Sequence, residues 1–421
     1  MSEPRTDRDM DQMLTAWMDA AAPERTPSRL LEETFASTMK SRQLRAWPWH
    51  RVTFGPVGRT AGSGAGIVLF AIVALVVLAM VVGLGGGRGL FLPPLPTESP
   101  TPTASAAPSP VLPTAIVVTP EATLAMAAPG WPMFDGTSLW IFSGDGLLSR
   151  IDPATNKISA PRAVLDPGTN NSGEAIDGAG LWVSSFDSNL VYRIDPASFT
   201  VVAKIPVGAS PEGLSVGADA VWVANLHGGS VTRINPATNK VVATVIVNSP
   251  GPGGPHAVGR GFGSVWVSAG NLGSGIGGPV VRIDPATNLI QATIPMPPNA
   301  SACGGFVFTA DSVWMDSCFD QRALVRIDPT SNTVATIPLA GFGDTITLID
   351  GVPWLRFKVT DAGPDPARLI RIDPATNTVD RVISVGEDFK YGGMLVAAGS
   401  VWVSDGANNQ LFRLPLAAFA P

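Results

Sequence analysis

The side chains best suited to chemistry in this sequence stand at one position of a repeat, ten residues before a tryptophan. In six repeats that position is occupied by Gly130, Glu212, His256, Gly304, Asp344 and Gly392. The remaining repeat, the second, is shorter by about two residues, so Glu174 takes the place there. Carboxylates near an imidazole can hold a cation or transfer protons. This position is therefore where binding or catalysis is expected.

The repeat itself predicts a four-stranded antiparallel blade. Its cleanest copy is Glu212–Val247, EGLSVGADAVWVANLHGGSVTRINPATNKVVATVIV. Four runs alternate apolar and polar residues, and Gly, Asn, Asp and Pro separate them, which is typical of a meander of short strands. Such a unit buries both faces only against neighbours of its own kind.

Two markers count the repeats. The third strand ends in an arginine at Arg150, Arg193, Arg233, Arg282, Arg326, Arg371 and Arg413, and the second strand carries Trp140, Trp182, Trp222, Trp266, Trp314, Trp354 and Trp402. The arginines are spaced by about 40 to 49 residues, the range of propeller blades. The sequence therefore predicts an all-β fold, a seven-bladed β-propeller, with the tryptophans packed between blades.

The motif after each arginine is a turn signal. Five copies read Arg-Ile-Asp/Asn-Pro followed by Ala-Thr-Asn or Thr-Ser-Asn, the second copy reads RIDPASF, and the last reads RLPLAAF. Asp or Asn accepts a backbone hydrogen bond two residues on, Pro favours a type I turn, and the final Asn tolerates the left-handed conformation. We interpret the motif as the hairpin between strands three and four, without a catalytic role.

In a closed ring, the position ten residues before each tryptophan surrounds one mouth of the central channel. Convergent polar groups at such a place form the usual ligand site of this architecture. We therefore predict a ligand site made of Glu174, Glu212, His256 and Asp344. An alternative interpretation, that these are solvated loop residues or turn caps, stays open. His227 lies in a predicted turn and is expected to be an exposed polar residue.

The chain before the propeller predicts a membrane anchor. Residues 1–60 carry two weak helical patterns, interpreted as a short helical cytoplasmic segment at the membrane surface or as a docking segment for a cytoplasmic partner. Residues 65–84 contain no charge and are long enough for one transmembrane helix. Five basic residues lie shortly before this span, at Lys40, Arg42, Arg45, Arg51 and Arg59, and only Arg88 closely follows it. The N-terminus is thus predicted to be cytoplasmic and the propeller extracytoplasmic.

The predicted propeller follows a linker. Residues 85–113 include a Pro-, Ser- and Thr-rich stretch that is expected to be an extended stalk. The propeller is assigned to residues 114–421. The last blade lacks a fourth strand at its C-terminal end, and we predict that residues 114–119 (TAIVVT) supply it and close the ring. Two longer loops, Ala269–Pro279 and Lys358–Arg368, are the expected places for individual function.

Composition excludes some classes of partner. The formal net charge of −6 argues against a nucleic-acid partner. The chain has only three histidines (His50, His227 and His256), and this scarcity argues against a multi-histidine metal site.

Two cysteines, Cys303 and Cys318, flank a predicted hairpin whose turn pairs Phe308 with Val313. Counting outward sets the cysteines directly across from each other, so we predict a disulfide, which an exported domain permits.

These repeats resemble the YVTN-type and virginiamycin B lyase-like seven-bladed propellers of bacteria. The carrying motif, Val-Trp-Val-Ala/Ser followed by Val-x-Arg-Ile-Asp-Pro-Ala-Thr-Asn, is met best at Ala220–Val247 and Leu181–Gly208. For an enzyme, the resemblance implies a His and a Glu near a magnesium ion at a channel mouth, and His256 with Glu212 or Glu174 fits that role. The lyase repeats typically read Asp-Gly-x-x-Trp-Phe-Thr-Glu, whereas this chain has Val-Trp-Val-Ser or Val-Trp-Val-Ala.

The leading functional hypothesis is therefore non-catalytic. It describes a single-pass protein of the cell membrane whose extracytoplasmic propeller binds a protein or small-molecule ligand, with no cofactor. The alternative hypothesis is a lyase or hydrolase that uses Mg or Ca at the channel mouth, with His256, Glu212 and Glu174 as catalytic residues. A third hypothesis, a cell-surface spacer, predicts no ligand.

Overall fold

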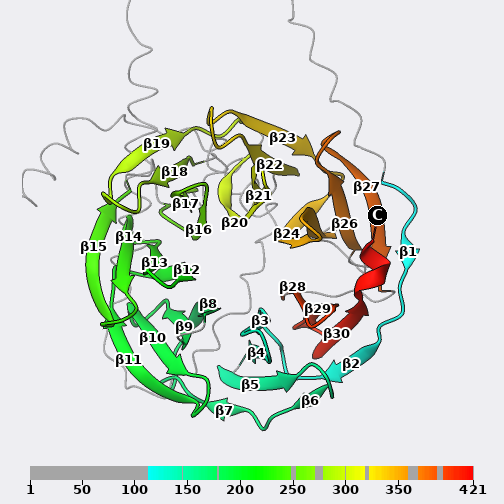
Figure 1. Cartoon of the computed structure of the whole chain (residues 1–421), viewed down its shortest axis with the longest axis horizontal. Coiled ribbons are helices and arrows are strands. Elements are labelled where there is room, and N and C mark those ends of the chain that lie inside the picture. Colours follow the sequence, from blue (N-terminus) through cyan, green and yellow to red (C-terminus); the bar gives the residue numbers. More distant parts are fainter. Residues whose placement is uncertain are drawn as a thin grey trace, which may run out of the picture. The chain divides into compact units, whose positions relative to one another are not determined.

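The described part of the chain is a ring of seven β-sheets (Figure 1). The structure, a computed structural model, describes residues 112–420 except 145, 178–179, 248–252, 271–277, 299, 318–321, 359–367 and 386–391. Ala104–Pro421 is one compact unit. The sequence thus predicted the propeller and its blade number correctly. The predicted cytoplasmic segment, membrane span and most of the linker lie outside the described residues, within which no helix is long and apolar enough to span a membrane.

Each blade is an antiparallel meander that runs from the channel outward. The innermost strands are β3 (Met133–Phe134), β8 (Asn171–Asp177), β12 (Pro211–Gly217), β16 (Ala257–Gly261), β20 (Ala302–Phe308), β24 (Phe342–Ile349) and β28 (Met394–Ala397). The second strands, which carry the seven tryptophans, are β4 (Leu139–Phe142), β9 (Gly180–Ser185), β13 (Ala220–Asn225), β17 (Ser264–Ser268), β21 (Val313–Ser317), β25 (Val352–Lys358) and β29 (Ser400–Asp405).

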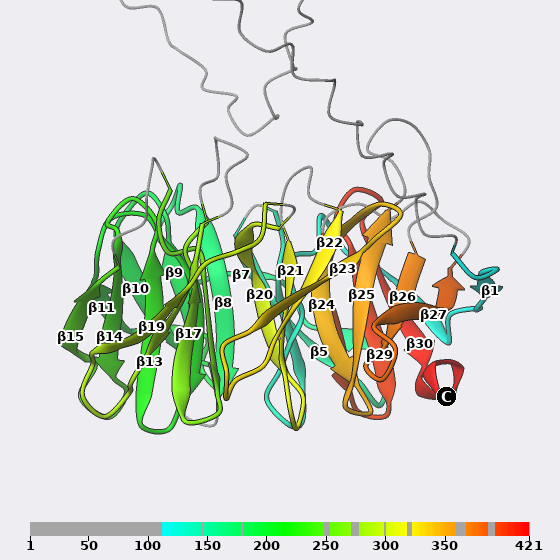
Figure 2. The ribbon, with the colours of Figure 1, turned by 90° about the horizontal axis from the view of Figure 1, so that it is seen from above.

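The third strands carry the repeated arginines. The outer strands form the rim of the ring, as β15 and β1 do at the two sides of Figure 2. The third strands are β5 (Leu147–Asp152), β10 (Leu190–Asp195), β14 (Ser230–Asn235), β18 (Val280–Ile283), β22 (Ala323–Ile327), β26 (Arg368–Asp373) and β30 (Gln410–Pro415). The outer strands are β6 (Lys157–Ile158), β7 (Arg162–Ala163), β11 (Thr200–Pro206), β15 (Lys240–Ile246), β19 (Ile290–Ile294), β23 (Val334–Pro338), β27 (Thr378–Ser384), β1 (Ile116–Val117) and β2 (Ala122–Ala125). A 3-10 helix, η1 (Leu416–Phe419), follows β30.

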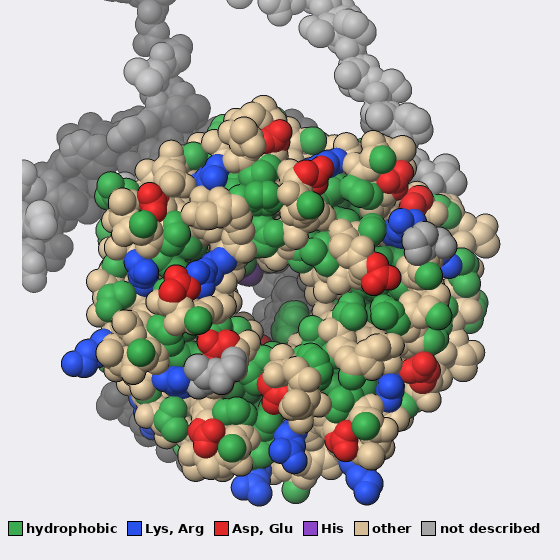
Figure 3. Space-filling model, viewed as in Figure 1, with side chains coloured by type: hydrophobic (Ala, Val, Ile, Leu, Met, Phe, Trp, Pro, Cys, Tyr) green, Lys and Arg blue, Asp and Glu red, His purple; other side chains and the backbone are tan. Residues whose placement is uncertain are grey.

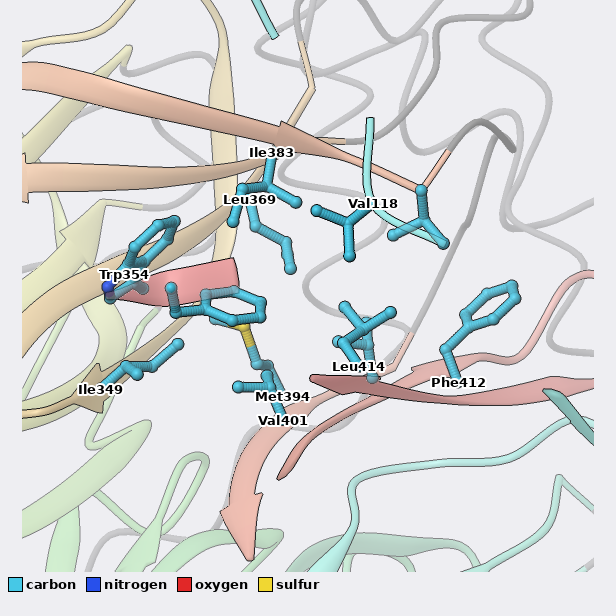
Figure 4. Packing of buried hydrophobic residues seen from close by; sticks show 12 residues of the cluster. Val118, Ile349, Trp354, Leu369, Ile383, Met394, Val401, Phe412 and Leu414 are labelled. Atoms are coloured by element: carbon cyan, nitrogen blue, oxygen red, sulfur yellow. The ribbon is translucent and has the colours of Figure 1, made fainter. Parts of the chain in front are cut away.

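The seven tryptophans pack between blades, as predicted. Each indole is at most 1% exposed. Trp222 of blade three, for example, packs with Val265 and Val281 of blade four. At the seam between blades six and seven, Trp354 belongs to a cluster that includes Leu414 (Figure 4). The hydrophobic core is thus a series of seams, and every blade needs both neighbours.

The ring closes with a different strand from the one predicted. Ile116–Val117 (β1), inside the predicted closing segment, pairs in parallel with β27 on the edge of blade six. The outer strand of blade seven is instead Ala122–Ala125 (β2), which pairs antiparallel with β30. β-propensity marked the Ile-Val-Val run as a strand but could not choose its sheet edge. Burial of Leu124 favours β2 as the outer strand of blade seven, because this side chain fills the seam between blades seven and one.

The predicted hairpin turns are confirmed in atomic detail. In blade three, the Asn235 Oδ1 atom accepts a hydrogen bond from the Ala237 amide at 2.9 Å. Asn239, which ends this turn, has a φ of 56°, and the equivalent asparagines of four other blades are also left-handed. This conformation is tolerated by Asn better than by most residues, so the motif encodes a backbone shape.

In five blades the arginine before the turn has a role that the sequence did not reveal, because it clamps the turn of the following blade. Arg233 of blade three donates from Nη1 to the Pro285 carbonyl at 2.7 Å and to Asn288 Oδ1 at 3.0 Å, both in blade four. Its guanidinium also lies over the Trp222 ring, 5.3 Å from the centroid. The same donation to a proline carbonyl and an asparagine is made by Arg193, Arg282, Arg326 and Arg413.

The two degenerate repeats mark the two seams that are built differently. Their turns end in Phe199 and Phe419 where the others end in asparagine. Phe199 packs on Trp140 with ring centroids 5.1 Å apart, and Phe419 packs on Trp354 at 4.9 Å. A contact between two aromatic rings thus replaces the arginine clamp, and such pairs contribute about 0.5–1.5 kcal/mol beyond burial.

We expect Arg233→Ala to lower the free energy of unfolding by about 2 kcal/mol, because it removes two hydrogen bonds from a charged donor. The matched control is Arg150→Ala at the same repeat position, since the Arg150 side chain is exposed and its seam uses Phe199 instead. Urea unfolding of the full-length chain, followed by tryptophan fluorescence, measures both. Equal losses in the two variants would contradict the clamp.

The corrected ring closure predicts that substitutions in β1 and β2 have different effects on stability. Leu124→Ala should cost about 2–3 kcal/mol of unfolding free energy, because Leu124 is buried in a seam. Val117→Ala should cost less than about 0.5 kcal/mol, since Val117 is 73% exposed. The same urea titration measures both. A larger loss of unfolding free energy for Val117→Ala than for Leu124→Ala would instead support closure by residues 114–119.

Candidate functional site

The predicted site residues lie in the innermost strands, except His256, which directly precedes β16. In every blade from two to seven, the residue after the tryptophan pairs with the inner strand, for example Val223 with Leu214 and Val267 with Val258. Two residues before these partners stand Glu212 and His256. The innermost strands surround the channel, which is open in the face shown in Figure 3. Glu212 and His256 therefore occupy equivalent positions on neighbouring inner strands.

Blade two requires a correction. Its inner strand pairs Asn171 with Ser185 and Glu174 with Val183. The residue equivalent to Glu212 is thus Ser172, ten positions before Trp182, and the predicted two-residue shortening of this blade was wrong. A one-residue bulge at this level is present in blades two and three alike, so the count of ten holds without adjustment. Glu174 lies one level deeper along the channel, equivalent to Leu214.

Hydrogen bonds to backbone carbonyl groups hold blades two, three and four together at this mouth. Ser184 Oγ donates to the Glu212 carbonyl at 2.5 Å, and the Gly213 amide donates to the His256 carbonyl at 2.9 Å. A Cβ atom at Gly173 would lie 2.3 Å from the Glu212 carbonyl oxygen, so only glycine permits this approach. Side chains on these three inner strands are consequently carried by a rigid backbone.

Glu212 and His256 meet across the seam between blades three and four. Glu212 Oε2 lies 3.2 Å from His256 Nε2, and the two side chains are 18% and 33% exposed. The Glu212 Oε2 atom is buried and receives no hydrogen bond of good geometry from the described residues. Burial raises the pKa of Glu212 to about 7 and lowers the pKa of His256 to about 4. The imidazole is therefore neutral at pH 7, in the form that accepts a proton or binds a metal.

Glu174 is a second carboxyl group without a cationic partner in its surroundings. Its Oε1 atom accepts a hydrogen bond from Asn171 Nδ2 at 2.5 Å. Burial raises the pKa of Glu174 to about 7, and this hydrogen bond opposes the shift only in part. The strands packed against β8 are β3, β9 and β12, and among their described residues only Glu212 is titratable. Glu174 thus titrates near neutral pH.

The remaining predictions divide between tested and untested. His227 is exposed, as predicted, and its Nδ1 atom lies 2.8 Å from Ser210 Oγ. The backbone of Asp344 lies at a bulge of β24, but its side chain lies outside the described ones. Most of the two long loops, residues 271–277 and 359–367, also lies outside the described part of the chain.

The cysteine hairpin has a different register from the one predicted. Phe308 pairs with Val313, as predicted, but a register shift follows and Ala302 pairs with Ser317. The uninterrupted count outward from Phe308 and Val313 is therefore wrong, because the bulge displaces one strand relative to the other. The side chain of Cys303 and all of Cys318 lie outside the description, so the disulfide stays a prediction.

One residue of this mouth was missed in the sequence. Trp131 precedes β3, is 51% exposed, and lies against Gly393 of blade seven, where a Cβ atom would be 2.5 Å from its ring. Gly393 follows the mouth position Gly392. The available signal was that Trp131 alone, among the tryptophans of the propeller, stands outside the repeat positions.

Glu212 and His256 can form hydrogen bonds, transfer protons or contribute ligands to a cation. Among the described residues, no three His, Cys, Asp or Glu side chains are arranged to hold a metal ion. Glu212 and His256 alone offer two ligands of the kind that a divalent cation accepts. A neutral imidazole beside a carboxyl group can also take a proton from a bound hydroxyl group or amine.

Comparisons with known proteins identify the fold and no family. No protein-family model and no curated protein sequence matches the chain. A chain of Kuenenia stuttgartiensis hydrazine synthase is similar at a TM-score of 0.58 and 14% identity, covering 70% of this chain and 97% of that one. A chain of a mitotic checkpoint complex is similar at a TM-score of 0.58 and 11% identity, covering 77% of this chain and 99% of that one. An enzyme and a protein assembly thus share this propeller fold.

The raised pKa of Glu174 predicts that Glu174→Gln stabilises the protein at high pH. Below about pH 4.5 the carboxyl group of Glu174 is protonated in both the folded and the unfolded state, so ionisation costs no stability. As the pH rises from there to 7, the unfolded state ionises more readily than the folded state, and the free energy of unfolding falls. The variant should therefore gain about 2–3 kcal/mol of unfolding free energy at pH 8.5 and almost none at pH 4. Urea titrations at the two pH values test this. A gain that does not depend on pH would show that packing, and not ionisation, is responsible.

Proposed function

We propose that this protein is a membrane-anchored binding module whose ligand enters the channel mouth at Glu212 and His256. The observation that carries the proposal is the pair itself. A buried carboxylate oxygen lies 3.2 Å from an imidazole nitrogen and receives no hydrogen bond of good geometry among the described residues. A ligand with a hydrogen-bond donor or positive charge would satisfy that oxygen. The propeller fold supports this function, because it gathers inner-strand ends around one opening.

The anchor and its topology belong to the same proposal. The uncharged run at residues 65–84 and the basic residues before it support one membrane span with a cytoplasmic N-terminus. The propeller then stands outside the cell membrane, on the linker of residues 85–113. β1 and β2 tie the start of the propeller to blades six and seven.

A second candidate function is a lyase or hydrolase of the virginiamycin B lyase-like type that uses Mg or Ca. The neutral state of His256 and its distance from Glu212 favour it, since the imidazole is then in the form that binds a divalent cation or accepts a proton. In this case Glu212 and His256 act at the metal or as the base.

The test is thermal unfolding of the full-length chain with magnesium, with calcium, and with a small-molecule library. A ligand at about 100 times its dissociation constant adds about 2.7 kcal/mol of stability. We expect the stabilisation by any ligand of this site to disappear in Glu212→Gln and in His256→Ala. His227→Ala is the control, because His227 is exposed on a turn of the same blade as Glu212.

The outcomes separate the two candidate functions. A shift with magnesium or calcium that both variants abolish favours the enzyme, and turnover assays would follow. A shift with an organic ligand alone favours the binding module. A ligand that stabilises both site variants as much as the wild-type protein binds elsewhere, and that result would overturn the proposed site.

A further inference from the structure

The outer strands of the blades differ at one position that decides whether another strand can pair with them. It lies three residues after the partner of the repeated arginine, and in blade three it is Ile246. Blades two, four and five have proline there, at Pro206, Pro295 and Pro338, and blade six has Ser384. Proline has no amide hydrogen and is a common protection of exposed sheet edges. These three blades therefore lack a hydrogen-bond donor at this point of the edge.

Blade six shows what an outer edge without this proline can bind. β1 lies outside β27 and pairs with it in parallel, and the Val118 amide donates to the Ser384 carbonyl at 2.9 Å (Figure 1). The added segment is extended and uncharged, with β-branched side chains at Ile116, Val117 and Val118. It does not complete the ring, because β2 supplies the outer strand of blade seven. An outer edge of this propeller thus holds an extended segment through backbone hydrogen bonds.

The outer strand of blade three, β15, offers the same backbone groups, and no strand of the described part of the chain pairs with its outer edge. The Val247 amide donates to the Gly229 carbonyl at 2.9 Å. The alternation of an antiparallel ladder therefore turns the backbone groups of Thr244 and Ile246 away from β14. Ile246 is equivalent to Ser384 of blade six and has an amide hydrogen. β15 thus presents outward donors and acceptors where three other blades present a proline.

β15 also exposes apolar side chains. Val241, Val242 and Ile246 are 41%, 55% and 60% exposed. The run from Val241 to Ile246, VVATVI, contains no charge and no proline, which is the composition of segments that pair with other chains. Blades one and seven avoid this hazard with short outer strands, of two residues each in β6 and β7 and four in β2. Among the described outer strands, β15 is thus a long one with neither a proline nor a covering strand.

From these observations we infer that the outer edge of β15 binds an extended segment of a separate protein, which adds a fifth strand parallel to β15 at Thr244 and Ile246. The chemistry of the occupant follows from β1, because the equivalent edge of blade six holds an uncharged, β-branched segment in that orientation. In a second copy of this chain that segment is already paired with blade six, which favours a separate protein as its source. This surface lies on the rim and does not depend on the channel mouth.

The experiment measures the fluorescence anisotropy of a labelled peptide with the sequence of residues 112–120, LPTAIVVTP, mixed with the full-length chain in detergent micelles. Empty micelles are the blank. Two modified peptides test backbone pairing. Methylation of the nitrogen at the Val118 position removes the donor for the Ile246 carbonyl and should abolish binding, as the bond from Val118 to Ser384 in blade six indicates. Methylation at the Val117 position should change the affinity less than about threefold, because that amide points away from the edge in a parallel pair.

Ile246→Pro should weaken binding of the unmodified peptide at least about tenfold, because it removes an outward donor. The variant should fold, since blade two has Pro206 at the equivalent position, and urea unfolding checks this. The matched control is Ile246→Val, which keeps both the amide hydrogen and a β-branched side chain and should bind within about twofold of the wild-type protein. The two methylated peptides test the same pairing on the unchanged chain.

Three results would overturn the inference: unchanged binding to Ile246→Pro, equal binding of the two methylated peptides, or no saturable binding up to about 1 mM peptide. Exchange of the peptide with β1 on blade six would appear as the first of these. Sedimentation of the full-length chain in micelles tests the source of the segment, and we expect a monomer. Self-association that Ile246→Pro abolishes would show that a second copy occupies the edge, and would overturn the assignment to a separate protein. The proposed site at Glu212 and His256 is tested independently of all these results.

Discussion

The ring depends on an arginine that reaches from one blade to the turn of the next. The guanidinium lies over the tryptophan of its own blade and donates to a proline carbonyl and an asparagine side chain across the seam. Because the donor is charged and the acceptors belong to a turn of fixed shape, each clamp joins a seam and sets the spacing of two blades. Two seams use a phenylalanine against the tryptophan instead. The same volume between blades is thus closed in two chemically different ways.

The clamps act at one face of the ring and leave the other face available for function. The turns that they bind join strands three and four, whereas Glu212 and His256 stand at the opposite ends of the blades, where the inner strands begin. The requirements of folding and of recognition therefore fall on different residues. The mouth positions vary from glycine to glutamate, histidine and aspartate within one chain, while the turn positions scarcely change.

The sequence predicted the features that recur in every blade, whereas predictions about a single blade or a single seam were wrong or missing. Seven tryptophans and seven arginines were enough for the blade number, and counting ten residues before each tryptophan located Glu212 and His256. The same count was correct for blade two, where an adjustment displaced the assignment from Ser172 to Glu174. Closure by Ala122–Ala125 was missed because Ala-Thr-Leu-Ala has little β-propensity, and its place depends on the burial of Leu124. The arginine clamp was missed because it joins residues about fifty positions apart.

Glu174 and Glu212 lower the stability of the folded protein when they ionise, and this cost indicates a functional role. Asp152 and Asp311, elsewhere on the ring, accept hydrogen bonds within turns that lower their pKa. Glu174 and Glu212 instead have raised pKa values, so their ionised forms destabilise the folded state near neutral pH. Glutamine at either position would avoid this cost. Residues that oppose stability while the surrounding scaffold is consistent are expected at functional sites, where a ligand supplies the missing interaction.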